Sequence, residues 1–446
     1  MGVGQPDHDH LRERGAWTSR AGQLLILTAA QTAGQTGWWA AYVAALPAAL
    51  DRPHPAAWLS AVTAAWCAPS MAARLAGGVI DRYGPRVTGA WAWAVAAAVA
   101  TVPVVVARPG LVMLLVVLGC VSAASSCAVA AGAAAPTWMP ARPDLIGAGS
   151  WLIVATYLPI GAGPAGASNL LAHAGPQAAW ALVAVLLAIA AASSLPVRAA
   201  RPATEPAARR FRVRPAVRGV LAITAGIYLS WGAVTILEPL YVRAVLARPL
   251  PVYGWLLCTW AAAAIVTAVL AGRWQQIVTA RWAVPLWALL VAVGEAVYLG
   301  TTLQAAAFTG AALFGAAATL FGLSCRAVIV AATPPAEHGR ALSLWFTVQD
   351  ACLTLPAALA GPAVAAIGLR AVLDAAAALA GGSSVVCMVR AAPPRGPARS
   401  WPKPAAARPR ACRETVQTIL TSQYSLSATP PTSKKEEPGR QRSRGV

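Results

Sequence analysis

The sequence has little charge and almost no lysine. Only 11% of its 446 residues are charged, whereas an ordinary soluble domain has roughly 25%. The three lysines, Lys403, Lys434 and Lys435, all lie near the C-terminus. A phosphate-binding GxxxxGK[ST] loop needs its lysine inside a folded core. The sequence therefore excludes a nucleotide-driven ATPase domain.

Patterns of metal ligands and paired cysteines are also missing. The sequence has no HExxH motif and no CxxC motif. Most of the eight cysteines fall inside apolar runs, where cysteine is typically a small buried hydrophobe. We therefore predict no metal site, no cofactor and no disulfide framework. The histidines stand at the termini or between apolar runs, at positions His8, His10, His54, His173 and His338.

Long apolar runs dominate what is present, since 58% of the residues are hydrophobic. A membrane-spanning helix takes about 20 residues. The runs predict an all-α membrane protein with twelve transmembrane helices joined by short loops. The expected ranges are 21–48, 56–80, 88–107, 111–134, 148–171, 177–196, 219–241, 251–272, 283–302, 305–331, 341–366 and 370–390.

The basic residues predict how the chain lies in the membrane. The formal net charge is +20, but the arginines stand between apolar runs and form no folded basic face, which argues against nucleic acid as a partner. If the N-terminus is inside, the inner segments before the tail hold sixteen arginines and the outer loops hold five. The positive-inside rule then places the protein in the cell membrane as a multi-pass chain with both termini cytoplasmic. The first run is too long for a cleavable signal peptide.

The loop from Val197 to Arg218 divides the helices six and six. It contains seven arginines and three prolines, so it cannot bury apolar area and is expected to be a linker on the cytoplasmic surface. The halves show a weak repeat, in which Gly163-Pro164 corresponds to Gly361-Pro362. We predict a cytoplasmic N-terminal segment (1–20), an N-terminal six-helix bundle (21–196), the linker (197–218), a C-terminal bundle (219–391) and a disordered basic cytoplasmic tail (392–446).

A charged motif stands between the second and third predicted helices. It reads Gly77-Gly78-Val79-Ile80-Asp81-Arg82-Tyr83-Gly84-Pro85-Arg86. This stretch resembles the GxxxDRxGxR[RK] loop motif of the major facilitator superfamily and lacks only the final basic residue. The resemblance implies the superfamily fold of two six-helix bundles over residues 21 to 390. The matching positions are Gly77, Asp81, Arg82, Gly84 and Arg86.

The motif has a physical interpretation of its own. A lone carboxylate at the membrane edge is unfavourable unless it is paired, and Asp81 has Arg82 and Arg86 in reach. Gly77 permits close helix approach and Gly84 permits a tight turn. The resemblance implies that this cluster latches the two bundles together on the cytoplasmic side. The alternative is a solvated turn whose arginines only anchor the loop.

Polar and aromatic residues share one face in the first helix and in the seventh. The resemblance implies that helices 1, 4, 7 and 10 line a central cavity, so these faces are expected to meet one substrate. The alternative is that the amides and hydroxyls satisfy neighbouring helices and the aromatic residues anchor the membrane interface. The cavity candidates are Gln31, Gln35 and Trp38 with Tyr42 nearer the outer surface, and Tyr228, Trp231 and Thr235 with Glu238 nearer the outer surface.

Four charged residues fall within or at the edge of apolar spans. Glu238, Glu295 and Asp350 are candidates for proton coupling, since a carboxyl in apolar surroundings is able to bind and release a proton. Arg326 and Asp350 are expected at similar depth on consecutive helices, where they would form an ion pair. The pair would be structural, or Arg326 would bind an anionic substrate.

These features predict a secondary transporter that moves a small organic solute by alternating access, is coupled to protons and acts as a monomer in the lipid bilayer. Efflux of a drug or metabolite and transport of a monocarboxylate-like anion both fit the sequence. The alternative is a membrane-embedded sensor or enzyme that transports nothing. An enzyme is disfavoured because the spans contain no histidine, lysine or GxSxG motif.

Overall fold

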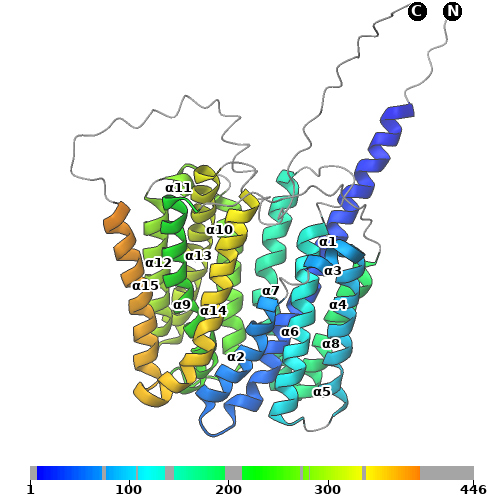
Figure 1. Cartoon of the computed structure of the whole chain (residues 1–446). Coiled ribbons are helices and arrows are strands. Elements are labelled where there is room, and N and C mark those ends of the chain that lie inside the picture. Colours follow the sequence, from blue (N-terminus) through cyan, green and yellow to red (C-terminus); the bar gives the residue numbers. More distant parts are fainter. Residues whose placement is uncertain are drawn as a thin grey trace, which may run out of the picture.

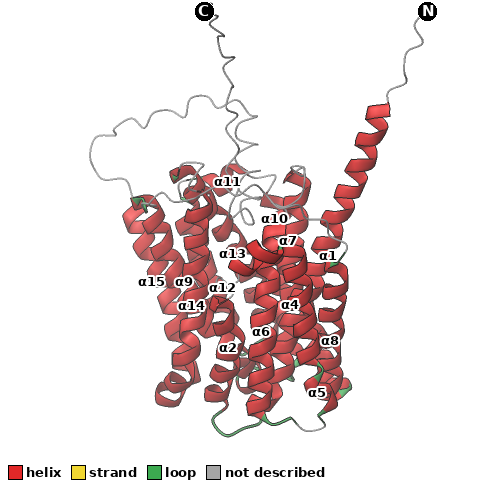
Figure 2. Cartoon of the chain, turned by 45° about the vertical axis from the view of Figure 1, so that its right-hand side comes forward, coloured by secondary structure: helices red, strands yellow, loops and turns green. Residues whose placement is uncertain are grey.

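The computed structural model describes residues 8–72, 77–106, 109–135, 145–195, 213–271, 275–280, 282–333 and 338–391. The regular elements of this part are helices, and it contains no strand (Figure 2). The predicted all-α class is confirmed. Most of the predicted linker and the whole predicted tail lie outside the described residues.

The first half of the chain forms the N-terminal helices, a name used here for α1 to α8. Their bounds are α1 (His8–Leu50), α2 (Pro55–Ala72), α3 (Gly77–Tyr83), α4 (Pro85–Ala100), α5 (Val102–Val105), α6 (Leu111–Ala134), α7 (Leu145–His173) and α8 (Gly175–Ser194).

The second half forms the C-terminal helices, α9 to α15. Their bounds are α9 (Pro215–Ala244), α10 (Pro251–Ala271), α11 (Gln275–Thr279), α12 (Ala283–Leu299), α13 (Gln304–Ala332), α14 (His338–Ile367) and α15 (Leu369–Ala391).

Each of the twelve predicted spans coincides with a described helix or a consecutive pair. The predicted helix 56–80 corresponds to α2 and α3, and 88–107 corresponds to α4 and α5. Helix α1 begins at His8, thirteen residues before the predicted start at residue 21. Seven helices of the described part are long and apolar enough to cross a membrane, or eight if a bent pair within α14 counts as one span. The chain is thus a multi-pass membrane protein, and the count of twelve crossings stays a prediction.

Proline and glycine set the starts of several helices. Pro85 and Pro215 stand at first positions, where a missing N–H leaves no hydrogen bond unmade. Gly84 precedes Pro85 with φ 82°, a left-handed conformation that glycine adopts without strain. This residue lets the chain turn sharply from α3 into α4.

The N-terminal and C-terminal helices pack as two groups side by side (Figure 1). Within the first group, α1 packs against α6, α7 and α8; within the second, α9 packs against α14 and α15. The groups meet mainly through two helix pairs, α2 with α14 and α7 with α10, and α2 also contacts α9. The large buried side chains include Trp93 and Trp180 in the first group and Trp345 and Phe321 in the second.

The described chain begins and ends on the same side of the molecule. The start of α1 and the end of α15 both lie at the top of Figure 1. We call this the terminal side. The connections from α1 to α2 and from α14 to α15 lie at the opposite end, which we call the distal side.

Candidate functional site

Helices α2 and α14 approach closely in their distal halves because Gly361 has no side chain. A Cβ atom at this position would lie 2.8 Å from the Cα atom of Ala57 in α2, too short for an unstrained contact. The backbone N–H of Gly361 also donates a hydrogen bond of 2.9 Å to Ser60 Oγ. The contact therefore joins the two helix groups.

Helices α7 and α10 meet in the same way through two glycines. A Cβ atom on Gly161 of α7 would lie 2.9 Å from the Cα atom of Cys258 in α10. A Cβ atom on Gly254, in the distal first turn of α10, would lie 2.7 Å from the Cα atom of Ala165. Close backbone packing through small residues is typical of helix association in membranes.

Tyr42 of α1 joins the groups through a backbone carbonyl of α9. Its hydroxyl donates a hydrogen bond of 3.2 Å to the Thr235 carbonyl and lies 3.2 Å from Thr63 Oγ1. In a regular helix the Thr235 carbonyl would accept from the N–H of residue 239, but Pro239 has no N–H. Tyr42 therefore satisfies a carbonyl that α9 leaves open. The Thr235 hydroxyl bonds within α9, to the Trp231 carbonyl at 2.9 Å.

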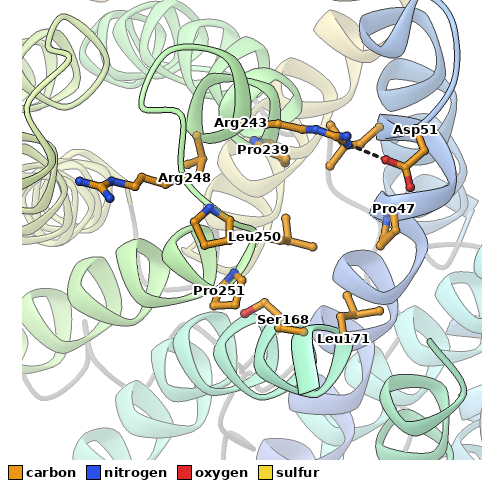
Figure 3. A pocket seen from close by; sticks show the side chains of 13 residues that line it. Pro47, Asp51, Ser168, Leu171, Pro239, Arg243, Arg248, Leu250 and Pro251 are labelled. Atoms are coloured by element: carbon orange, nitrogen blue, oxygen red, sulfur yellow. Dashed lines mark hydrogen bonds and ion pairs between the residues drawn. The ribbon is translucent and has the colours of Figure 1, made fainter. Parts of the chain in front are cut away.

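A pocket of about 370 Å³ lies on the distal side between the two groups. Its walls come from the ends of α1, α7 and α9 and from the start of α10 (Figure 3). Arg243 of α9 reaches across one edge of this pocket to Asp51, with 2.7 Å between Nη1 and Oδ1. The two side chains are 53% and 66% exposed, so water screens their attraction.

The predicted cavity residues of α1 bond largely to α6. Gln31 donates through Nε2 to the Ala128 carbonyl at 3.3 Å, and Trp38 donates through Nε1 to Ser122 Oγ at 3.2 Å. Gln35 is half-buried. For Gln31 these contacts favour the alternative that its amide satisfies a neighbouring helix. The cavity role of Gln35 and Trp38 stays a prediction.

Tyr228 and Trp231 belong to an aromatic cluster of the C-terminal helices. The Trp231 ring centroid lies 5.2 Å from Tyr228, 5.4 Å from Trp260 and 5.3 Å from Phe314. Tyr157 of α7 approaches Trp260 at 5.7 Å and thus brings the N-terminal helices to this cluster. The aromatic cluster therefore presents flat apolar ring faces near the boundary between the two helix groups.

Two of the predicted carboxyls are buried. Glu238 is 4% exposed and its Oε1 accepts a hydrogen bond from the Tyr298 hydroxyl of α12. Glu295 has no exposed area, and the Ser230 hydroxyl of α9 bonds its Oε1 and lies 2.7 Å from the Ala376 carbonyl of α15. Among the described residues, neither carboxyl has a cationic partner. Their coupling role stays a prediction.

Arg326 is 8% exposed in the middle of the C-terminal helices. Its guanidinium carbon lies 5.3 Å from the Trp345 ring centroid and 5.5 Å from that of Phe346, both on α14. These are cation–π distances. Arg326 and Asp350 both act electrostatically on Tyr228. The predicted ion pair between them and the choice between its two roles stay predictions.

The loop motif is described only in part. Arg82 and Arg86 are exposed, and Gly84 supplies the turn. Gly77 begins α3 and Asp81 lies within it, but the surroundings of these two residues lie outside what the structure describes. The latch therefore stays a prediction.

Sequence reasoning missed most of the contacts that close the distal side. Ser60 and Gly361 carry no signal that they meet. Pro239 does carry a signal, because a proline inside a span leaves the carbonyl four residues earlier without its usual N–H donor. Asp51 and Arg243 also carry a weak signal. One is an acidic residue in a loop and the other a basic residue at a helix end, and such residues can pair across helices.

Comparison with known proteins finds similarity to one family. The sequence pattern of the Major Facilitator Superfamily matches residues 220–429. The "Uncharacterized MFS-type transporter y4rN" of Sinorhizobium fredii (strain NBRC 101917 / NGR234) is 29% identical over 247 residues, which are 51% of this chain. The chain spans 58% of that relative's length.

A crystal structure of a mutant of the nucleoside transporter NupG is similar in fold to most of this chain. The match has a TM-score of 0.62 at 12% identity and covers 82% of this chain and 99% of that one. The second half of the sequence and the fold of the described helices thus resemble the major facilitator superfamily. The superfamily fold also relates this chain to a bacterial homologue of the human lysosomal transporter Spinster, in an inward-facing and unoccupied conformation. That match has a TM-score of 0.58 at 12% identity and covers 92% of this chain and 99% of that one. These superfamily proteins are transporters and not enzymes.

Proposed function

We propose that this chain is a secondary transporter of the major facilitator superfamily that moves a small organic solute across the cell membrane by alternating access. The observation that carries the proposal is the set of contacts between the two helix groups in their distal halves. Tyr42 with Thr235, Ser60 with Gly361 and Asp51 with Arg243 are contacts that can separate without breaking either group.

In this proposal the structure is a state closed on the distal side. The N-terminal bundle (21–196) and the C-terminal bundle (219–391) rock against each other, so that the distal contacts of the α2–α14 and α7–α10 pairs form and separate in each cycle. The positive-inside rule makes the terminal side cytoplasmic, so the closed distal side faces outward. The likeness to an inward-facing Spinster homologue supports this assignment.

The substrate region is proposed at mid-depth, where the bundles meet. The aromatic cluster around Trp231 offers flat apolar faces, and Tyr157 contributes to it from the other bundle. Drug or metabolite efflux and transport of a monocarboxylate-like anion are both part of the proposal. Proton coupling is proposed because Glu238 and Glu295 are buried without cationic partners in the described part. The carrier would work as a monomer in the bilayer.

The test is flux into proteoliposomes with a reversible lock on the distal side. Candidate solutes are screened with and without a pH gradient to find one that is transported. Asp51→Cys and Arg243→Cys are then combined and joined with a cleavable bismaleimide. We expect cross-linking to abolish flux and cleavage to restore it, because the distal side has to open in every cycle.

Each single cysteine variant treated with the same reagent is the matched control and should transport normally. Undiminished flux through fully cross-linked protein would contradict alternating access at this surface. If no solute in a broad panel moves under any gradient, the transporter proposal itself fails.

A further inference from the structure

The pocket of about 370 Å³ on the distal side, called the distal pocket here, has walls from both helix groups (Figure 3). Pro47 of α1 and Leu171 of α7 lie on one side. Pro239 of α9 and Leu250 of the connection from α9 to α10 lie on the other. The volume is within the range of about 300–1,000 Å³ that is typical of small-molecule sites. Because its walls belong to two groups, the pocket has this shape only while the distal side is closed.

The connection from α9 to α10 gives the distal pocket a fixed wall. Pro249 and Pro251 restrict the backbone on both sides of Leu250, whose side chain lies near the centre of Figure 3. The N–H of Arg248 donates a hydrogen bond of 3.0 Å to the Val242 carbonyl in the last turn of α9. A ligand therefore meets a wall that is already ordered, and its binding does not have to order a loop.

The lining of the distal pocket is apolar except at its exposed edge. The charged residues that line it are Asp51, Arg243 and Arg248, and all three are exposed. The other lining side chains are apolar apart from Ser168, whose hydroxyl already donates to the Ala165 carbonyl at 3.2 Å. Two guanidinium groups and one carboxylate leave one net positive charge. These walls and this charge favour a ligand with an apolar body and a single negative charge.

Arg243 is the residue that can bind the negative group. One of its five N–H donors binds Asp51, with 2.7 Å between Nη1 and Oδ1. The remaining donors make no hydrogen bond within the described part of the chain. Asp51 thus fixes the guanidinium at the pocket edge and leaves donors of the kind that bind a carboxylate in a bidentate manner. Arg248 adds positive charge, although its side chain points away from the other labelled side chains in Figure 3.

The distal pocket is separate from the proposed substrate region. Thr235, whose carbonyl Tyr42 binds, lies four residues before Pro239 on α9, or about 6 Å at 1.5 Å per residue. Trp231 of the aromatic cluster lies four residues further toward the terminal side. The contact between Tyr42 and Thr235 therefore stands between the pocket and the substrate region while the distal side is closed.

We propose that the distal pocket binds a small organic monocarboxylate with a compact apolar body, and that this ligand holds the distal side closed. The carboxylate binds the Arg243 guanidinium, and the body packs against Leu250 and the surrounding prolines. The ligand touches both helix groups, so it binds the closed form and loses its site when the groups separate. It is a regulator that acts from the distal side and is not the carried solute. Binding itself does not require transport, whereas the holding effect rests on the proposed function.

The first test measures binding by calorimetry with the full chain in lipid nanodiscs, and empty nanodiscs provide the blank. The probes share one apolar ring and differ in charge: cyclohexanecarboxylate, the neutral cyclohexanecarboxamide and the cation cyclohexylmethylammonium. We expect the carboxylate to bind about fivefold more tightly than the amide, the size expected for an exposed charge contact. The ammonium should bind most weakly. Added salt should reduce the difference between carboxylate and amide.

Variants of Arg243 test whether this residue binds the carboxylate. Its side chain is 53% exposed, so substitutions here should not disturb folding. Arg243→Gln should remove the preference for the carboxylate over the amide, whereas Arg243→Lys keeps the charge and should keep the preference. Arg52→Gln is the matched control, because Arg52 is an exposed arginine of the α1–α2 connection that does not line the pocket. This control should bind the probes as the wild type does.

The second test measures whether the ligand holds the distal side closed. Spin labels are attached at Ala174 and Thr302 after replacement of the native cysteines. Both residues are exposed and lie outside the pocket, in the α7–α8 and α12–α13 connections. The ratio of short to long distances reports the closed-to-open ratio. The carboxylate at about ten times its Kd should raise this ratio about tenfold, because a ligand that binds one state shifts the equilibrium by a factor of 1 + [L]/Kd.

The proposal is wrong if no probe binds, if the carboxylate and the amide bind equally well, or if Arg243→Gln keeps the preference for the carboxylate. It is also wrong if the bound carboxylate leaves the closed-to-open ratio unchanged or lowers it. Failure of the proposed function looks different. In that case the carboxylate still binds through Arg243 and still favours the short distance, but no solute crosses proteoliposomes.

Discussion

A methyl group at Gly361 should open the distal side of the molecule. In Gly361→Ala the new Cβ atom would lie 2.8 Å from the Ala57 Cα atom and 3.0 Å from the Ala56 carbonyl oxygen. Both are backbone atoms of α2, so neither can rotate away. Overpacking of this kind costs about 1–3 kcal/mol. The penalty applies only while α2 and α14 are in contact.

The closed-to-open ratio should therefore fall by roughly fivefold to roughly a hundredfold, because about 1.4 kcal/mol corresponds to a factor of ten. Spin labels attached at Ala172 and Arg248, two exposed residues of the distal pocket, after replacement of the native cysteines report this ratio as the weights of the short and long distances. Gly161→Ala at the α7–α10 contact should act in the same direction, since its Cβ atom would lie 2.9 Å from the Cys258 Cα atom.

Gly322→Ala is the matched control for both substitutions. It changes the same residue type within helix α13, where a Cβ atom would meet nothing within 4 Å. The gain of about 1 kcal/mol in helix propensity on replacing glycine by alanine is common to all three variants and to both states. If Gly361→Ala keeps the ratio of the Gly322→Ala control, the tight α2–α14 contact does not hold the distal side closed.

Four other single substitutions test charged side chains. Arg243→Ala removes an exposed ion pair with Asp51, which is worth about 1 kcal/mol at most. The closed-to-open ratio should therefore change by less than about fivefold, and its dependence on salt concentration should disappear. A larger change would mean that water screens the pair far less than its exposure indicates. Asp81→Asn should abolish flux while surface expression stays normal, and wild-type flux would leave only the solvated-turn interpretation. Arg326→Ala and Asp350→Ala should each lose folded protein or transport, and exchange of the two charges should restore folding; if both single variants fold and transport normally, the two residues are not paired.

The helices could be predicted from the sequence because each depends on nearby residues. The expected range 111–134 is that of α6, and 251–272 differs from α10 by one residue. An apolar run between prolines or arginines is enough to define such a helix. Breaks are harder to predict, since the run 56–80 is unbroken in hydropathy although the structure describes α2 and α3 within it.

The contacts between helices could be predicted only in part. Glu238 and Glu295 stand out as acids in apolar runs, and both are buried. The partner of each polar group depends on the packing of distant helices. Gln31 illustrates this limit, because an amide in a span suggests a cavity whereas the Ala128 carbonyl accepts its hydrogen bond. Ser60 and Gly361 are 301 residues apart, and no local pattern brings them together.

The hydrogen bond from Tyr42 to the Thr235 carbonyl also bears on how such a chain can evolve. Pro239 leaves that carbonyl open, and Tyr42 is useful there only while it stays open. A mutation that returned an N–H to position 239 would let α9 complete its own ladder and leave the phenol without its acceptor. Loss of the phenol would instead strand a carbonyl in the membrane interior. A substitution at Tyr42 or at Pro239 is therefore expected to be tolerated best when the other residue changes as well, although the two lie in opposite halves of the chain.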